Sequence, residues 1–123
     1  MVDYLEFKLW GKEETLPIEY NCYDGESITE QQIDAINNIQ AHVEFFDNTL
    51  DQVIGFLKKR GCDTELNEEN IYDYVQPQCI FVKHEVEKPR VALMCLSVLE
   101  EDGIAVIIAE DGTITVSTQD LLI

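Results

Sequence analysis

Residues 78–117, QCIFVKHEVEKPRVALMCLSVLEEDGIAVIIAEDGTITVS, determine the fold class that we expect for this chain of 123 residues. They contain four apolar runs, at about 78–84, 90–99, 104–109 and 113–117. Short polar segments separate the runs. Asp102-Gly103 and Asp111-Gly112, between the last three runs, are typical of hairpin turns. The segment therefore predicts an antiparallel meander of four strands.

Two further strands are expected near the N-terminus. Residues 3–10, DYLEFKLW, roughly alternate polar and apolar side chains, which is the period of a half-buried strand. Gly11-Lys12-Glu13-Glu14 is predicted to turn the chain, and residues 16–22, LPIEYNC, predict a second strand that Asp24-Gly25 closes. Pro17 lacks a backbone N–H, so we expect it near the start of this strand or at a sheet edge.

Helical signals fill the middle of the chain. Thr29 and Gln32 have the spacing of a capping box. Apolar residues then recur at steps of three and four, at positions 33, 36, 39, 43, 46, 50, 53 and 57. Asp47-Asn48-Thr49 is a second start signal, so we expect one helix over about 29–46 and another over 49–60.

The expected end of the second helix has its own signals. Lys58-Lys59-Arg60 would complement the negative end of the helix, and Gly61 would supply the left-handed residue that often follows it. Residues 63–74 are polar and acidic, and Asn67 is a plausible cap for a short helix.

These elements together predict an α+β domain. Its sheet would be largely antiparallel, with about six strands, and its two main helices would pack on one face. The sequence contains no linker, low-complexity tract or internal repeat. Residues 1–123 are therefore expected to form a single α+β domain.

The charge of the chain is strongly negative. Twenty-five acidic residues and eight Lys and Arg residues give a formal net charge of −17. Binding to nucleic-acid phosphates or to an anionic membrane surface requires the opposite sign, so we expect neither partner. The charge is also uneven, because three segments contain no Lys or Arg, namely 13–57, 61–82 and 91–123.

The sequence also predicts where the protein is located. No run of 18 apolar residues is present, and residues 1–4, MVDY, have neither the basic head nor the apolar run of a signal peptide. The four cysteines, at positions 22, 62, 79 and 95, form no C-x-x-C pair, and the first, third and fourth of them fall in apolar runs. We expect buried, reduced thiols and a cytoplasmic location.

Catalytic and metal-binding patterns are weak. His42 and His84 are the only histidines, and each is expected to be a surface or partly packed residue. Asp63-x-Glu65-x-x-Glu68-Glu69 offers oxygen ligands but lacks the pattern of a calcium loop. Acidic runs such as Glu100-Glu101-Asp102 are expected to be solvated near turns. We therefore expect no enzyme activity, no metal and no cofactor.

One acidic segment is the candidate surface for a protein partner. It combines carboxylates with two tyrosines, a residue type that is favoured in interfaces, and comprises Asp63, Glu65, Glu68, Glu69, Tyr72, Asp73 and Tyr74. A cationic partner would be steered toward such a surface. The equally weighted alternative is that both tyrosines are simply packed under the loop.

Several motifs resemble those of an uncharacterised family of small bacterial α+β domains. These motifs are Trp10, Leu16-Pro17-Ile18, Thr29-Glu30-Gln31-Gln32 with Ala35-Ile36, Asp102-Gly103-Ile104-Ala105-Val106, Asp111-Gly112-Thr113-Ile114 and Gln119-Asp120. That family is similar to domains found among the immunity proteins of polymorphic and contact-dependent toxin systems. The resemblance spans most of the chain and implies the fold and a binding role, but no catalytic residues.

The leading hypothesis is therefore an immunity protein that binds and neutralises a cognate toxin domain, of a cationic, nuclease type. One alternative is a small ligand-binding module or enzyme with a pocket between helices and sheet. Another is an acidic adaptor domain. The sequence leaves the oligomeric state open.

Overall fold

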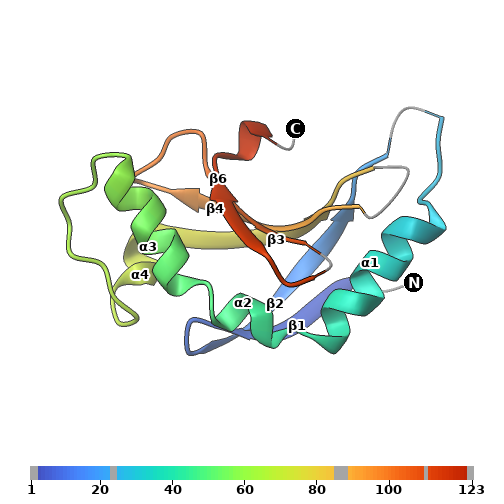
Figure 1. The fold of residues 1–123 in the computed structure, drawn as a ribbon, viewed down its shortest axis with the longest axis horizontal. Helices are drawn as coiled ribbons and strands as arrows, with labels where there is room; N and C mark the ends of the chain where they lie inside the picture. Colours follow the sequence, from blue (N-terminus) through green and yellow to red (C-terminus); the bar gives the residue numbers. More distant parts are fainter. Residues whose placement is uncertain (1–2, 23–24, 85–88, 110, 122–123) are drawn as a thin grey trace.

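The computed structural model describes residues 3–22, 25–84, 89–109 and 111–121. In this part of the chain six strands form one sheet (Figure 1), and they are β1 (Tyr4–Leu9), β2 (Lys12–Tyr20), β3 (Val75–Val82), β4 (Val91–Ser97), β5 (Ile104–Ile108) and β6 (Ile114–Ser117). The helices are α1 (Glu30–Ala41), α2 (Glu44–Asp47), α3 (Leu50–Lys59) and α4 (Ile71–Tyr74), and a 3-10 turn covers Gln119–Leu121. The predicted α+β class is confirmed.

The sheet follows the order of the sequence, β1-β2-β3-β4-β5-β6. Every neighbouring pair is antiparallel except β2 and β3, which run parallel from Ile18↔Ile80 to Tyr20↔Val82. A parallel pair requires the chain to return to the end of the sheet at which it started. The segment between β2 and β3, which contains all four helices, makes this return.

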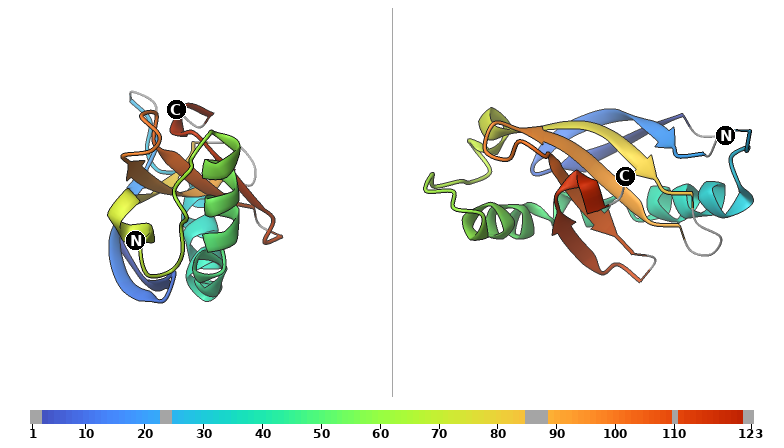
Figure 2. Two further views of the ribbon diagram at one scale, coloured as in Figure 1. Left: turned by 90° about the vertical axis from the view of Figure 1, so that its left-hand side faces the viewer. Right: turned by 90° about the horizontal axis from the view of Figure 1, so that it is seen from above.

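The two longer helices, α1 and α3, pack on the same face of the sheet, as predicted. Figure 2 shows them on one side of the strands, with α2 between them. The core between this face and the helices includes Ile36, Val53, Leu57, Leu93 and Val106, each at most 1% exposed. The opposite face carries a smaller apolar cluster, made of Phe81, Ala92, Met94, Ala105 and Ile107. The central strands β4 and β5 are therefore largely buried on both faces, which explains their nearly continuous apolar sequences.

Helix α1 begins at the predicted capping box. The N–H of Gln32 donates to Thr29 Oγ1 at 3.1 Å, and Gln32 Oε1 accepts from the N–H of Thr29 at 3.0 Å. The Gln32 amide nitrogen also donates to the carbonyls of Asn21 and Val82, at 2.7 and 3.2 Å. Gln32 is fully buried, so one side chain fixes the start of the helix to the ends of the two parallel strands.

The prediction of one helix over 29–46 was wrong. Helix α1 ends at Ala41, and α2 starts three residues later, at Glu44. Phe46, which is fully buried, packs against Phe7 of β1 with ring centroids 5.0 Å apart. The apolar spacing continues through the break, but the backbone bends because Phe46 must reach the hairpin of β1 and β2.

The turn predicted at residues 11–14 is shorter than expected. Strand β2 already begins at Lys12, and Trp10 and Gly11 alone connect the strands, with φ angles of 51° and 85°. A tryptophan rarely occupies this left-handed conformation. Here the Trp10 indole is 2% exposed and its Nε1–H donates to Thr49 Oγ1 at 3.0 Å, so tertiary contacts determine the turn.

The predicted end of the second helix is confirmed at α3. Gly61 has a φ of 94°, its N–H donates to the carbonyl of Lys58, and the N–H of Cys62 donates to the carbonyl of Leu57. These are the two hydrogen bonds of a Schellman motif. The short helix expected from Asn67 begins later, at Ile71, because the Asn67 side chain caps a preceding turn.

Among the residues that the structure describes, none of the helices has the length and apolar content that crossing a membrane requires.

Candidate functional site

The negative charge of this protein is surface charge. Of the 25 acidic side chains, 18 are exposed, Glu14 and Asp47 are half-buried, and Glu100 is buried, while the other four lie outside the described residues. The exposed basic residues in the described part of the chain are fewer, and they are Lys8, Lys12, Lys58, Lys59 and Arg60. A partner in solution therefore meets mainly carboxylates.

One carboxylate is neutralised inside the fold. Glu100 accepts two hydrogen bonds from the Arg60 guanidinium, one from Nε to Oε2 and one from Nη2 to Oε1 at 3.2 Å. The hydrogen bond to Glu100 raises the pKa of Arg60. The expectation that Glu100 is solvated was therefore wrong, because its side chain pairs with Arg60 beside the end of α3. Glu101 and Asp102 are exposed, as expected.

The predicted acidic segment lies between α3 and β3. Asp63, Glu65, Glu68, Glu69 and Asp73 are all exposed, and within the described residues none of them forms an ion pair. These five carboxylates are called the acidic loop below. Their charge is available to a partner.

Hydrogen bonds between side chains and backbone fix the acidic loop. Asn67 Oδ1 accepts from the N–H groups of Glu69 and Asn70, at 2.9 and 3.0 Å. Asn70 Oδ1 in turn accepts from the N–H of Asn67 at 2.8 Å, and Asn70 Nδ2 donates to the carbonyl of Glu65. Leu66 and Ile71 are buried on either side. The carboxylates therefore project from a loop that is already ordered, which lowers the entropy cost of binding.

The two predicted interface tyrosines are held by the fold. Tyr72 OH donates to the carbonyl of Leu9 at 2.5 Å, its ring lies 5.6 Å from the Trp10 ring, and burial raises its pKa. Lys12 Nζ lies 4.8 Å from the centre of the Tyr72 ring. Tyr74 is half-buried against the main core. Of the two expectations for Tyr72 and Tyr74, packing under the loop matches the contacts that these side chains make.

The structure brings the acidic loop next to the turn between β1 and β2. An open cavity of about 660 Å³ separates them, lined by Trp10, Gly11, Lys12, Asn67, Glu68, Glu69 and Tyr72. The Glu68 carboxylate lies against Gly11, where an added Cβ would be 2.0 Å from Glu68 Oε1. The N–H of Gly11 donates to Asp47 Oδ1 at 2.9 Å. Sequence spacing gave no sign of the contact between Glu68 and Gly11, because these residues are more than fifty positions apart.

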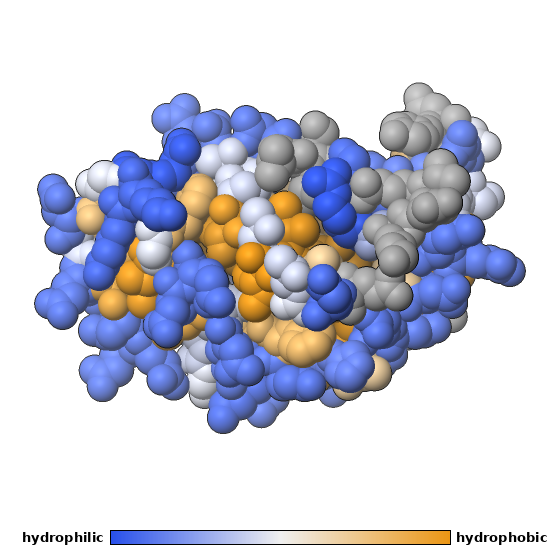
Figure 3. Space-filling view, in the orientation of Figure 1, coloured by the Kyte–Doolittle hydropathy of each residue, from blue (hydrophilic) through white to orange (hydrophobic). Residues whose placement is uncertain are grey.

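Sequence reasoning missed a second concave feature, the α1 groove. It is a cavity of about 300 Å³ between α1 and the strands, lined by Gln31, Asp34, Ala35, Asn38, Ile39, Pro89, Val91 and Ile108. Figure 3, in the orientation of Figure 1, shows apolar side chains in the middle of the molecule, to the left of α1, with hydrophilic side chains around them. The sequence contained one signal for it, since Gln31, Asp34, Ala35 and Asn38 recur at helical spacing beside the apolar face of α1.

Two of the four thiols, Cys79 and Cys95, have pKa values that disfavour nucleophilic chemistry at neutral pH. All four cysteines are free, as expected, but Cys95 alone is fully buried, while Cys22, Cys62 and Cys79 are half-buried. Burial raises the pKa of Cys95 and, together with Glu19, raises that of Cys79 to about 11. Since the thiolate is the nucleophile, these shifts suppress reactivity.

The Cys79 pKa leads to a test. With a pKa of about 11, about 0.1% of this thiol is ionised at pH 8, so we expect slow labelling by iodoacetamide that accelerates about tenfold per pH unit up to pH 10. Glu19→Gln removes the carboxylate 3.7 Å from Cys79 Sγ and should lower the thiol pKa and speed labelling at pH 9. Peptide mass spectrometry measures both rates. Glu6→Gln, at an exposed acid on β1, is the control, and equal rates in the two variants would contradict the assignment.

The described residues contain no group of three or more His, Cys, Asp or Glu that could hold a metal ion. His42, 3.6 Å from Glu44, and His84, 2.9 Å from Glu26, line neither of the two cavities. No family model, curated protein or solved structure matches this chain.

Proposed function

We propose that this chain is an immunity protein that binds a cognate toxin domain in the cytoplasm and neutralises it through its acidic surface. The observation that supports this most directly is the acidic loop, five exposed carboxylates on an ordered segment that form no ion pair with any described residue. The toxin domain would be cationic and of a nuclease type. The immunity protein itself would have no enzyme activity.

Electrostatics gives this function a mechanism. A nuclease needs a positive groove to bind phosphates, so a rigid set of carboxylates can occupy that groove in their place. The net charge of −17 would also steer a cationic partner and raise the association rate by 10- to 1,000-fold at low salt, a range typical of steered association. The same charge repels acidic proteins, which contributes specificity.

The acidic loop predicts a specific loss of binding. Reversal of three charges in Glu65→Lys, Glu68→Lys and Glu69→Lys should weaken binding to the toxin domain encoded beside this gene by at least about tenfold, because close charge pairs couple by about 1.5 kcal/mol or more. Calorimetric titration at 50 and 300 mM salt measures the effect, and salt should weaken wild-type binding more than binding of the variant.

The matched control reverses the same number of charges elsewhere. Glu6, Glu13 and Glu19 are exposed on β1 and β2. At 300 mM salt, which screens the long-range attraction due to net charge, the variant with lysine at these three positions should bind the toxin domain within about threefold of wild type. If the wild-type protein neither binds the toxin domain nor protects cells that produce it, the proposal is refuted. An equal loss in the control variant would place the interface elsewhere than the acidic loop.

A further inference from the structure

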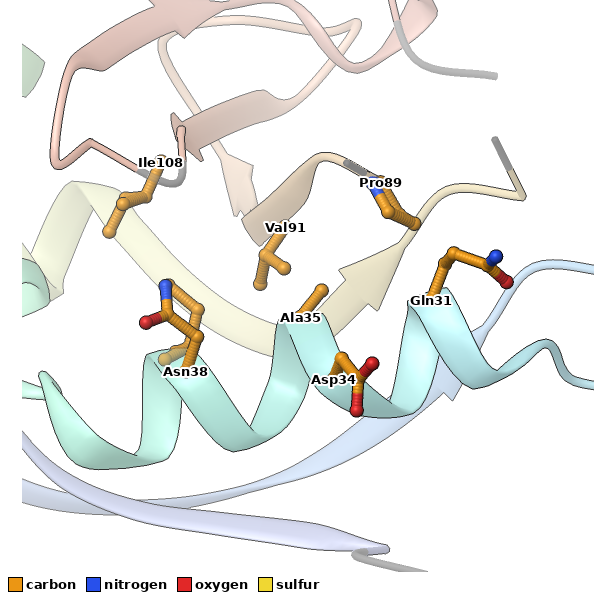
Figure 4. A pocket seen from close by; sticks show the side chains of 8 residues that line it. Gln31, Asp34, Ala35, Asn38, Pro89, Val91 and Ile108 are labelled. Carbon is orange, nitrogen blue, oxygen red and sulfur yellow. The ribbon is translucent and has the colours of Figure 1, made fainter. Parts of the chain in front are cut away.

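The α1 groove has an apolar floor. Ile39 of α1, Val91 at the start of β4 and Ile108 at the end of β5 are each 2% exposed, and they line the groove with Pro89 and Ala35. These five apolar residues are called its floor below. Ala35 is a small side chain between larger apolar residues of the helix, so the space in front of Val91 stays open. Figure 4 shows Val91, Pro89 and Ile108 on the wall opposite α1. This floor can contact an apolar stem.

The helix side of the groove is polar and acidic. Gln31, Asp34 and Asn38 stand along it (Figure 4). The side chains of these three residues form no hydrogen bond or ion pair within the part of the chain that the structure describes. Among the residues that the structure describes, no Lys or Arg lines the cavity. The groove therefore offers one carboxylate and two amide oxygens as free acceptors beside an apolar surface.

The size and charge of the groove define the group that fits. About 300 Å³ is the lower limit for small-molecule sites and suits one or two side chains. An arginine has an apolar stem that can lie on Val91 and Ile108, and a planar guanidinium that donates to carboxylate and amide oxygens. The net charge favours a cation and opposes an anionic ligand.

We propose that the α1 groove receives an arginine side chain of the protein partner, with the guanidinium at Asp34 and Asn38 and the stem on Val91 and Ile108. This inference rests on the proposed function, because it assumes a cationic protein partner. It adds an anchor point on the helix-bearing face, separate from the acidic loop. Buried arginines at pockets of this kind often dominate interface energetics.

Hexylguanidinium is the probe that tests the groove without the toxin. It carries the guanidinium group of arginine on a longer apolar stem, and its ten heavy atoms predict a dissociation constant on the order of 5 mM at low salt. Binding is measured by NMR of protein with labelled isoleucine and valine methyl groups. We expect saturable shifts at Ile39, Val91 and Ile108, and at least about fivefold weaker binding of hexanoate and of hexan-1-ol.

Two variants test the roles of the acid and of the open floor. Asp34→Asn should weaken hexylguanidinium about fivefold, whereas Asp51→Asn, the same change at an exposed position on α3, should leave its affinity unchanged. Ala35→Leu fills the space in front of Val91 and should abolish the methyl shifts, with circular dichroism as the check on folding. Asp34→Asn still tests the groove if Ala35→Leu proves unstable.

Three outcomes would overturn the assignment. If hexanoate bound as tightly as hexylguanidinium, the Asp34 carboxylate could not be the group that selects the ligand. If hexan-1-ol bound equally well, the groove would instead be an apolar small-molecule site. NMR shift changes that are spread over the surface and do not saturate would show that hexylguanidinium interacts only with the overall negative charge of the protein. Each of these results leaves the immunity function intact, because that function is tested by toxin binding and by the charge reversals in the acidic loop.

Discussion

Replacement of Gln32 with leucine is expected to lower the free energy of unfolding by about 3 kcal/mol. The substitution keeps the side-chain volume but removes an amide that donates to the carbonyls of Asn21 and Val82 and accepts from the N–H of Thr29. Val82 keeps a second bond, from the N–H of Asn21 at 2.9 Å. The Asn21 carbonyl and the Thr29 N–H lose their partners in a part-buried site. Urea titration followed by fluorescence of Trp10, the single tryptophan, measures the change.

The control for this prediction is Gln40→Leu, on the same helix. Gln40 is exposed, so the same chemical change should alter the free energy of unfolding by less than about 0.5 kcal/mol. A small effect of Gln32→Leu, comparable with that of Gln40→Leu, would show that the hydrogen bonds to the strand ends contribute little. Gln32→Glu is informative as well, because it keeps an acceptor for Thr29 but places oxygen against two carbonyls.

Phe46→Ala is expected to destabilise the protein by about 4 kcal/mol. Phe46 is 0% exposed and packs on Phe7, at the point where the helical region bends toward the first hairpin. Loss of the ring would leave a cavity between α2 and β1 and would remove the main reason for the bend. The same urea titration measures the loss, and Trp10 reports it locally, because Thr49 joins its indole to the carbonyl of Phe46.

The neighbouring Phe45 supplies the control for Phe46. Its side chain is half-buried and stacks on His42 with centroids 5.3 Å apart, so Phe45→Ala should cost only about 1 kcal/mol. If the two alanine variants unfolded at the same urea concentration, the bend between α1 and α2 would need another explanation.

Local signals in the sequence predicted most of the elements. The capping box of Thr29 and Gln32, the glycine end of α3 and the apolar strands of the meander act within a few residues, so spacing alone identifies them. The class and the one-sided packing of the helices followed from this pattern of elements. Strand boundaries differed by up to four residues, the largest difference being at the start of β2.

Features decided by distant contacts could not be predicted. The left-handed Trp10 depends on Thr49, and the break after Ala41 depends on Phe7. Glu100 was expected to be exposed to solvent, because the acidic run in which it lies gives no sign of its hydrogen bonds with Arg60. The parallel pairing of β2 with β3 is also a tertiary choice, since nothing in either strand specifies the direction of its neighbour.

In the candidate site, too, local features could be predicted and features that depend on distant contacts could not. Composition identified the acidic loop as a charged segment, and its five carboxylates are exposed in the structure. Its tyrosines could not be assigned from sequence, because the partners of Tyr72 are on the first hairpin. The α1 groove was missed because its two walls come from residues 31–39 and from the ends of two strands in the second half of the chain.

The order of the strands has a kinetic consequence. Four of the five neighbouring strand pairs in the sheet are joined by short connections, so the first hairpin and the meander can each assemble early with little loss of chain entropy. Joining β2 to β3 is different, because it closes the whole helical segment from Asn21 to Tyr74 as a single loop. We expect that closure to set the folding barrier, so shortening the 63–70 connection should speed refolding more than unfolding.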